Sequence, residues 1–206
     1  MAISWTVLTG LKTVTGSIGQ WVNRSDLPTT NILLEAEAWI YQRLRVREMV
    51  TDEAFSFAIS TSSKALSTLS GTFLDPVQFV PYEWGYELPF VSERRYRPSR
   101  DTDGVLYTGT PSQWTIIGTT AYVDVTCVAA FPGRLMYYAQ PAALSASNET
   151  NFLTVRYPTL LRMACMGFAY QFMKDQTRTQ EYLGYAMAAI GEAAVTNDLA
   201  RRGQYA

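Results

Sequence analysis

The stretch Pro28 to Met49, PTTNILLEAEAWIYQRLRVREM, decides the fold. Its apolar residues recur at helical spacing and mark a face that must be buried: Leu33, Ala36, Ile40 and Leu44. Acidic residues come first and basic residues last, which suits the dipole of a helix. The pattern therefore predicts a helix over 28–49, capped by Asp26 or Thr29. Ser4 to Asn23 shows a weaker helical period, and its threonines and glycines lower its intrinsic helicity.

Helical patterns return near the other end of the chain. Thr159 to Lys174 is apolar on nearly every side, which is typical of a central helix in a bundle, and Pro158 suits its first turn. Thr177 and Gln180 have the spacing of a capping box, so a last helix is predicted from there to about Asn197. Helices with this much apolar surface need partners, and the first helix supplies one.

Between the helical segments the pattern is typical of strands. Glu53 to Ile59 alternates small or polar side chains with large apolar ones. Further strands are expected at residues 77–82, 113–117, 121–128 and 134–139. Together these segments predict an antiparallel β region of roughly four to six strands.

The order of these elements predicts an α+β fold. The helices at each end of the chain cannot bury their apolar faces alone. We therefore expect a helical bundle built from the N- and C-terminal helices, with an antiparallel β domain inserted between its halves. The expected limits are 1–50 for the first half of the bundle, 51–148 for the β-rich domain, and 149–206 for the second half with a C-terminal tail.

Composition restricts the classes of function. Of the 206 residues, 17% are charged and 48% apolar, which indicates either surface buried between chains or a well-packed core. The net charge of −1 gives no general affinity for nucleic acid or for an acidic membrane. Two cysteines, Cys127 and Cys165, are too few for a disulfide framework. No signal peptide is visible. The most apolar stretch, Leu160–Met173, is too short to span a bilayer. We expect a soluble intracellular protein.

Catalytic and metal chemistry find little support in the sequence. Histidine is absent, which removes the commonest general base, Ser–His and Cys–His pairs, and histidine metal sites. Asp101, Asp103 and Asp124 are candidates for a cation site. However, Asp101–Gly104 is only a fragment of a calcium loop, and a polar turn is favoured. We predict no catalytic residue, no cofactor and no metal ligand.

Two groups of arginines and one tryptophan are candidates for contacts with partners. Residues 92–101 hold four arginines around one tyrosine; such a segment can grip phosphate, but a solvated loop or a protein contact is favoured. Arg43, Arg45 and Arg47 lie near the end of the first helix, where a solvated helix end and a partner's carboxylates are equally supported explanations. Trp84 lies in a loop-like stretch and is the favoured interface anchor.

Three segments of the chain resemble the head-to-tail adaptor, or connector, proteins of tailed bacteriophages, in particular those of short-tailed phages. The matching segments, in the same order and at similar spacing as in that family, are Trp21–Met49, Thr110–Gly118 and Met136–Leu161. The run PAALSASNETNFLTVRYPTLL is the most specific part. Glu83–Gly109 departs from the family pattern.

The resemblance implies a virion structural protein at the head–tail interface and not an enzyme. Such adaptors form a homo-oligomeric ring, a dodecamer, below the portal protein, and DNA passes through its centre without sequence-specific binding. The helical bundle would pack against the portal, and the β domain would face neighbours and a downstream tail or nozzle protein. Asp198–Ala206 would reach up to the portal. Assembly in the host cytoplasm and a role in DNA ejection are also implied, with no cofactor and no membrane.

The candidate residues for a portal or subunit interface are Arg43, Arg45, Arg47, Trp84, Arg94, Arg95, Arg97, Arg201, Arg202 and Tyr205. Three other functions stay open. A tail-completion or stopper protein that gates DNA exit would be another structural component. A β-rich glycan-binding module would use Tyr82, Trp84 and Tyr86 as a sugar platform. A carboxylate-based hydrolase is the third alternative.

Overall fold

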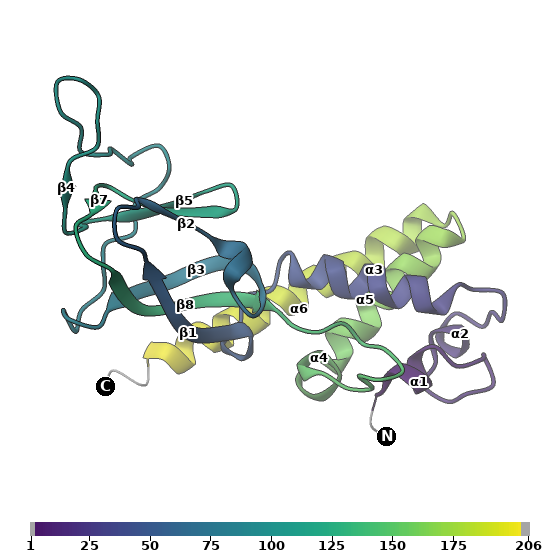
Figure 1. Cartoon of the computed structure of the whole chain (residues 1–206). Helices are drawn as coiled ribbons and strands as arrows, with labels where there is room; N and C mark the ends of the chain where they lie inside the picture. Colours follow the sequence, from purple (N-terminus) through teal and green to yellow (C-terminus); the bar gives the residue numbers. More distant parts are fainter. Residues whose placement is uncertain (1–2, 203–206) are drawn as a thin grey trace. The chain divides into compact units, whose positions relative to one another are not determined.

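The computed structural model describes residues 3–202 of the chain, with side chains up to residue 197. The chain is an α+β protein of helices and mostly antiparallel sheets (Figure 1), as the sequence predicts. It divides into two compact units, one of Met1–Glu48 with Pro141–Ala206 and one of Met49–Gln140. We term them the helical unit and the β unit.

The helical unit is organised around α5. Its helices are α1 (Trp5–Leu8), α2 (Ile18–Trp21), α3 (Thr29–Tyr41), α4 (Phe152–Arg156), α5 (Pro158–Phe172) and α6 (Gln176–Arg202). Helix α5 packs against α2, α3, α4 and α6 (Figure 1). Because it has neighbours on several sides, its fully buried residues include Leu161, Ala164, Cys165 and Ala169. The helix predicted over 159–174 is confirmed.

The helix predicted over 28–49 is wrong in its last part, because α3 ends at Tyr41. Arg45 closes this end: its Nη1 donates to the carbonyl oxygens of Tyr41 at 2.7 Å and Leu44 at 2.8 Å. A helix leaves its last carbonyl oxygens unpaired, so the guanidinium takes the place of a further turn. Arg47–Met49 then forms a short 3-10 helix. Leu44 is nevertheless fully buried, as the apolar stripe predicts.

The predicted caps of α3 and α6 are also wrong. Asp26 pairs with Arg24 at 2.5 Å, which lowers the pKa of Asp26 to about 2, and α3 begins without a side-chain cap. A carboxylate held by a guanidinium two residues away is not free to accept from the first turn. Asp175 caps α6 instead of Thr177, because its Oδ1 accepts from the N–H of Arg178 at 3.1 Å.

The helix predicted over 4–23 forms only the two short helices α1 and α2. Ser4 Oγ and Ser17 Oγ each cap one of them by accepting from a backbone N–H, at 3.4 Å and 3.0 Å respectively. Between the helices Gly16 has a φ of +90°, a conformation that glycine adopts without strain and that interrupts a helix. The glycine-rich composition thus gives two turns of helix in place of one long element.

The β unit contains two antiparallel sheets and one short parallel pair. Its strands are β1 (Val50–Phe57), β2 (Ser63–Ala65), β3 (Thr72–Pro81), β4 (Thr108–Gly109), β5 (Trp114–Ile117), β6 (Thr120–Val123), β7 (Thr126–Cys127) and β8 (Phe131–Gln140). The sheets have the orders β1-β8-β3 and β2-β6-β5, and β4 pairs with β7. The strand predicted over 121–128 is divided in two at Asp124. The other predicted strands are confirmed with slightly different limits.

Aromatic rings fill the core of the β unit. The ring centroid of Phe79 lies 5.9 Å from that of Phe57 and 6.1 Å from those of Trp114 and Phe131. These inclined contacts are the arrangement that aromatic quadrupoles favour. Gly133 on β8 lies directly against this cluster, because a Cβ atom there would be 2.7 Å from the ring of Phe79. The close approach of β8 to β3 therefore requires glycine.

Candidate interaction surfaces

A buried carboxylate joins two distant segments of the helical unit. Glu37 on α3 is only 1% exposed. Its Oε2 accepts from the backbone N–H of Leu144 at 3.0 Å, and its Oε1 accepts from Asn151 Nδ2 at 2.7 Å and from the hydroxyl of Tyr41 at 3.1 Å. Burial raises the pKa of Glu37, while these three hydrogen bonds favour the ionised form and limit the rise. We term this arrangement the Glu37 clamp.

Asn151 links the Glu37 clamp to the start of α4. Its Oδ1 accepts from the backbone N–H groups of Leu153 at 3.0 Å and Thr154 at 3.3 Å, and the hydroxyl of Thr154 accepts from the N–H of Asn151. Glu37 is not among the residues that the sequence singles out as candidates. Its signal was an acidic residue within the apolar stripe of α3, four residues before Tyr41.

The three arginines near the end of α3 have different environments. The guanidinium of Arg43 lies 4.6 Å from the ring centroid of Trp39 and donates to its carbonyl oxygen at 3.1 Å. Arg45 closes the helix end, as described above. Arg47 is exposed, and its backbone N–H donates to Oδ1 of Asn197 on α6 at 3.1 Å. Arg45 is therefore a structural residue. Arg43 and Arg47 are exposed, but Arg43 already contacts Trp39, and Nε of Arg47 lies 3.8 Å from Oε1 of Glu48.

The Trp84 region presents aromatic side chains on the β unit. The rings of Trp84 and Tyr86 stack with centroids 5.3 Å apart, and Trp84 also meets Phe131 edge-on at 5.5 Å. Trp84 is thus partly buried against the aromatic core. Tyr86 is 63% exposed and Tyr82 is 56% exposed. The core holds Trp84 in place, and the tyrosines beside it form most of the accessible aromatic surface.

The arginine-rich segment is fixed to the β unit by its tyrosine. The hydroxyl of Tyr96 donates to the carbonyl oxygen of Val123 at 2.8 Å. Arg97 Nη1 donates to the carbonyl oxygens of Arg94 and Tyr96, at 3.1 Å and 2.9 Å. Arg94 and Arg95 are exposed, and their side chains have no hydrogen-bond or ion-pair partner among the described residues. The segment is therefore an ordered turn that presents two free guanidinium groups.

The remaining candidates from the sequence are not brought together. Arg201 and Arg202 end α6, but their side chains lie outside the described residues, as does the whole of Tyr205. Asp101 Oδ1 accepts from the N–H groups of Asp103 at 3.0 Å and Val105 at 2.8 Å, which makes a polar turn. In the part of the chain that the structure describes, no three His, Cys, Asp or Glu side chains lie where they could hold a metal ion.

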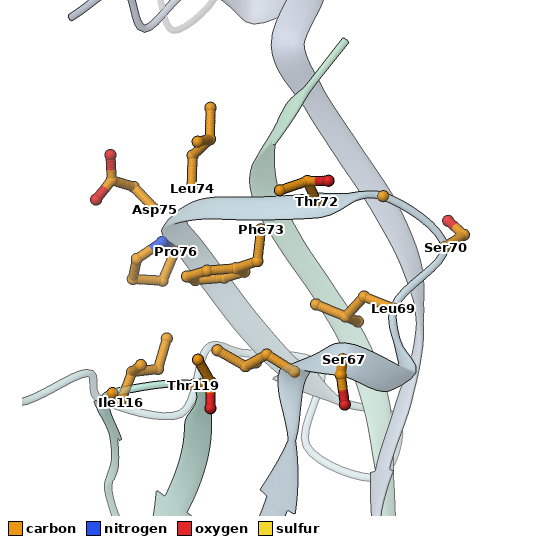
Figure 2. Close-up of a pocket in the computed structure, with 13 residues that line it drawn as sticks. Ser67, Leu69, Ser70, Thr72, Phe73, Leu74, Asp75, Pro76, Ile116 and Thr119 are labelled. Atoms are coloured by element: carbon orange, nitrogen blue, oxygen red, sulfur yellow. The ribbon is translucent and has the colours of Figure 1, made fainter. Parts of the chain in front are cut away.

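An open hollow of about 640 Å³ lies on the β unit, between the start of β3 and the turn that joins β5 to β6. Figure 2 shows Phe73 and Pro76 pointing from β3 toward Ile116 and Thr119 on the opposite wall, while Asp75 points away. Asp75 is the one titratable residue among those that line the hollow, all of which are described. The walls thus offer apolar contact and no acid–base pair for catalysis.

The outer side of α6 carries mostly small and apolar residues, with the exposed Glu181 and Glu192 beside them. One side of this helix is buried through Ala186, Ile190 and Ala193. The opposite side carries, at helical spacing, the exposed residues Gly184, Ala188, Gly191 and Val195. A solvent-facing helix normally carries charged and polar residues in the middle of its outer side. We term these four residues the outer face of α6. In the described part of the chain, no helix is both long and apolar enough to cross a membrane.

Comparison with known proteins supports the resemblance found in the sequence. The model of the SU10 adaptor protein family matches residues 9–205. A comparison with curated proteins found no match. The family match includes Glu83–Gly109, which the resemblance in the sequence did not cover. An adaptor family suggests a structural role as a component of the virion. Since the match extends over almost the whole chain, the chain belongs to the SU10 adaptor protein family, as expected for a phage head-to-tail adaptor.

Proposed function

We propose that this chain forms a homo-oligomeric ring, a dodecamer, that joins the portal protein to the tail around the DNA channel. The observation that carries this proposal is the outer face of α6, where Gly184, Ala188, Gly191 and Val195 are exposed in a single chain. Exposed apolar surface of this kind marks contact sites between proteins. A ring of identical chains buries such a face on every copy.

In this proposal both ends of the chain form one helical bundle, and the β unit is a domain inserted between its halves. The bundle packs against the portal, and the exposed guanidinium groups of Arg43 and Arg47 contact its carboxylates. The tail at residues 198–206 reaches up to the portal, and the β domain faces neighbouring copies and a downstream tail or nozzle protein. The ring assembles in the host cytoplasm. A net charge of −1 lets DNA pass through the channel without being held during ejection.

The experiment that tests this proposal combines mass measurement with imaging. Native mass spectrometry of the purified chain, alone and with its portal, should give a discrete oligomer of twelve copies, expected from the resemblance. Electron microscopy should place this oligomer below the portal. A chain lacking residues 198–206 should still assemble but should no longer bind the portal in a pull-down. A chain that is monomeric both alone and with the portal would contradict the proposal.

The stacked rings of Trp84 and Tyr86 favour a second candidate function, a glycan-binding module. Exposed aromatic rings are the surface on which sugars stack, and Tyr86 is 63% exposed. Binding of oligosaccharides by a monomer, with loss of binding in Tyr86→Ser, would support this function in place of the ring. Glycan-array binding and oligomeric mass, measured on the same sample, separate the two.

A further inference from the structure

The β unit carries two charged patches of opposite sign that are not neutralised within the chain. The first, the acidic turn, is residues 82–87, YEWGYE, and the second, the arginine segment, is residues 92–97, SERRYR. Glu83 and Glu87 are exposed, and neither has a hydrogen-bond or ion-pair partner among the described residues. Arg94 and Arg95 are in the same situation. Each patch is therefore free to bind charge from outside its own chain.

A short extended stretch keeps the two patches apart. The N–H of Leu88 donates to the carbonyl oxygen of Phe79 at 2.8 Å, and the N–H of Val91 donates to that of Trp114 at 2.9 Å. Leu88 is also buried. Extended chain advances about 3.3 Å per residue, so residues 88–91 separate the patches by on the order of 13 Å. Because β3 holds one end of this stretch and β5 the other, the patches cannot fold back onto each other.

We propose that the acidic turn of one copy binds the arginine segment of the next copy, a contact that rests on the ring proposed above. The charges are complementary, and tyrosine, tryptophan and arginine are the residues enriched at the centres of protein interfaces. Two different patches of one chain that bind each other make a head-to-tail contact, and such contacts form a ring when the rotation from copy to copy closes. Arg97 orders its turn through its own carbonyl contacts, so Arg94 and Arg95 carry the contact.

The charge of the β unit favours a second copy over DNA as the partner of the arginine segment. The unit contains nine acidic and six basic residues, and four of the six basic residues lie between Arg94 and Arg100. An acidic unit with one basic turn repels a phosphate backbone over most of its surface. The same unit supplies, at Glu83 and Glu87, the carboxylates with which arginines pair.

The test exchanges the signs of the two patches in separate variants. Glu83→Arg with Glu87→Arg makes both patches basic, and Arg94→Glu with Arg95→Glu makes both acidic. For each variant alone, native mass spectrometry should show an assembled fraction at least tenfold smaller than that of the wild type. An equimolar mixture should assemble again, in particles with an even number of chains and a 1:1 composition. Recovery in the mixture also shows that both variants are folded.

Asp103→Arg is the control, because it reverses an exposed charge of the same unit outside both patches; it should assemble like the wild type. Suppose that the wild type assembles. If either variant alone then assembles equally well, or if the mixture stays unassembled, the proposed contact is wrong but the ring is not contradicted. If the wild type forms dimers or open chains but no closed ring, and each variant alone loses this association while the mixture regains it, the contact is right and the ring is wrong. If the wild type is monomeric, the contact is wrong even where the oppositely charged variants associate. If nothing associates, both proposals fail.

Discussion

The helical unit and the β unit each contain a buried carboxylate that fixes a loop, but they use it over very different distances along the chain. Glu37 in the helical unit is 1% exposed and binds Leu144 and Asn151, which lie 107 and 114 residues away. Asp124 in the β unit is 3% exposed and binds Ser112 and Gln113, only 12 and 11 residues away. The first carboxylate closes a unit made of two separate chain segments, and the second fixes one local turn.

Because of this difference, removal of either carboxylate should have different consequences in the two units. Loss of a long-range contact releases a whole segment, whose return costs the entropy of closing a long loop. Loss of a local contact releases only the turn beside it. We therefore expect disruption in the helical unit to spread through both of its chain segments, and disruption around Asp124 to stay local.

The largest effect is expected for Leu44→Asp. Leu44 is fully buried just beyond α3, so the variant would place a carboxylate without a partner among apolar side chains. The expected loss of unfolding free energy is more than about 4 kcal/mol. Hydrogen exchange should show lost protection in residues 3–48 and 141–197 and retained protection in 49–140. Leu34→Asp, at a position 42% exposed on α3, is the control and should cost far less. Equal melting of Leu44→Asp and the wild type would show that the buried face is assigned wrongly.

The difference between long-range closure by Glu37 and local closure by Asp124 is tested by Glu37→Ala and Asp124→Ala. Glu37→Ala leaves the N–H of Leu144 without its acceptor and removes one of the two acceptors of Asn151 Nδ2, so we expect a loss of about 2–4 kcal/mol. Asp124→Ala leaves the N–H and hydroxyl of Ser112 unpaired, for a loss of about 1–3 kcal/mol. Exchange should increase across 141–157 in the first variant and only near 110–125 in the second.

The exposed Glu35 on the same helix gives the matched control, since Glu35→Ala removes a carboxylate that has no hydrogen-bond or ion-pair partner among the described residues. It should change the unfolding free energy by less than about 0.5 kcal/mol. If Asp124→Ala loosens the β unit as widely as Glu37→Ala loosens the helical unit, the distinction between long-range and local closure is wrong.

The fold could be predicted where a periodic apolar pattern is enough. The helix at α5 and the strands β1, β3 and β8 follow from the spacing of apolar residues alone. The end of α3 could not be predicted in this way, because it depends on which carbonyl oxygens the guanidinium of Arg45 reaches. Periodicity carries no information on such contacts.

The candidate surfaces could be predicted only in part. Arg94, Arg95 and the Trp84 region lie on the accessible surface of the β unit, because arginine and aromatic residues in a loop-like stretch are a local signal. The Glu37 clamp was missed, since its donors lie more than a hundred residues away and include a backbone N–H, which any residue supplies. The sequence of α6 contains several small residues, but only the structure shows which of them form its exposed outer face.

A smaller effect is expected when alanine replaces either of two glycines, one on α5 where it packs against α6 and one on the outer face of α6. A Cβ atom at Gly167 on α5 would lie 2.7 Å from Cδ2 of Leu183 on α6, so Gly167→Ala should destabilise the helical unit by about 1–3 kcal/mol. A Cβ atom at Gly184 on the outer face would meet no atom within 4 Å. Gly184→Ala should therefore stabilise a single chain by up to about 1 kcal/mol through helix propensity. Thermal melts at low protein concentration check both signs. Destabilisation by both substitutions would mean that the outer face is covered even in the single chain.

The smallest effect is a pH dependence carried by Glu37. Burial raises its pKa in the folded state above the ordinary 4.5, so the folded chain binds this proton more tightly than the unfolded chain does. The contribution of Glu37 to stability therefore increases as the pH falls from neutral through its folded pKa, and it becomes constant below about pH 4.5.

Urea unfolding of the wild type and Glu37→Gln across this range isolates the effect, because every other titrating group is common to both. The difference in unfolding free energy should grow toward acid. A difference that shrinks toward acid would mean that hydrogen bonding to the carboxylate outweighs its burial, and the Glu37 clamp would then act as a stabilised anion.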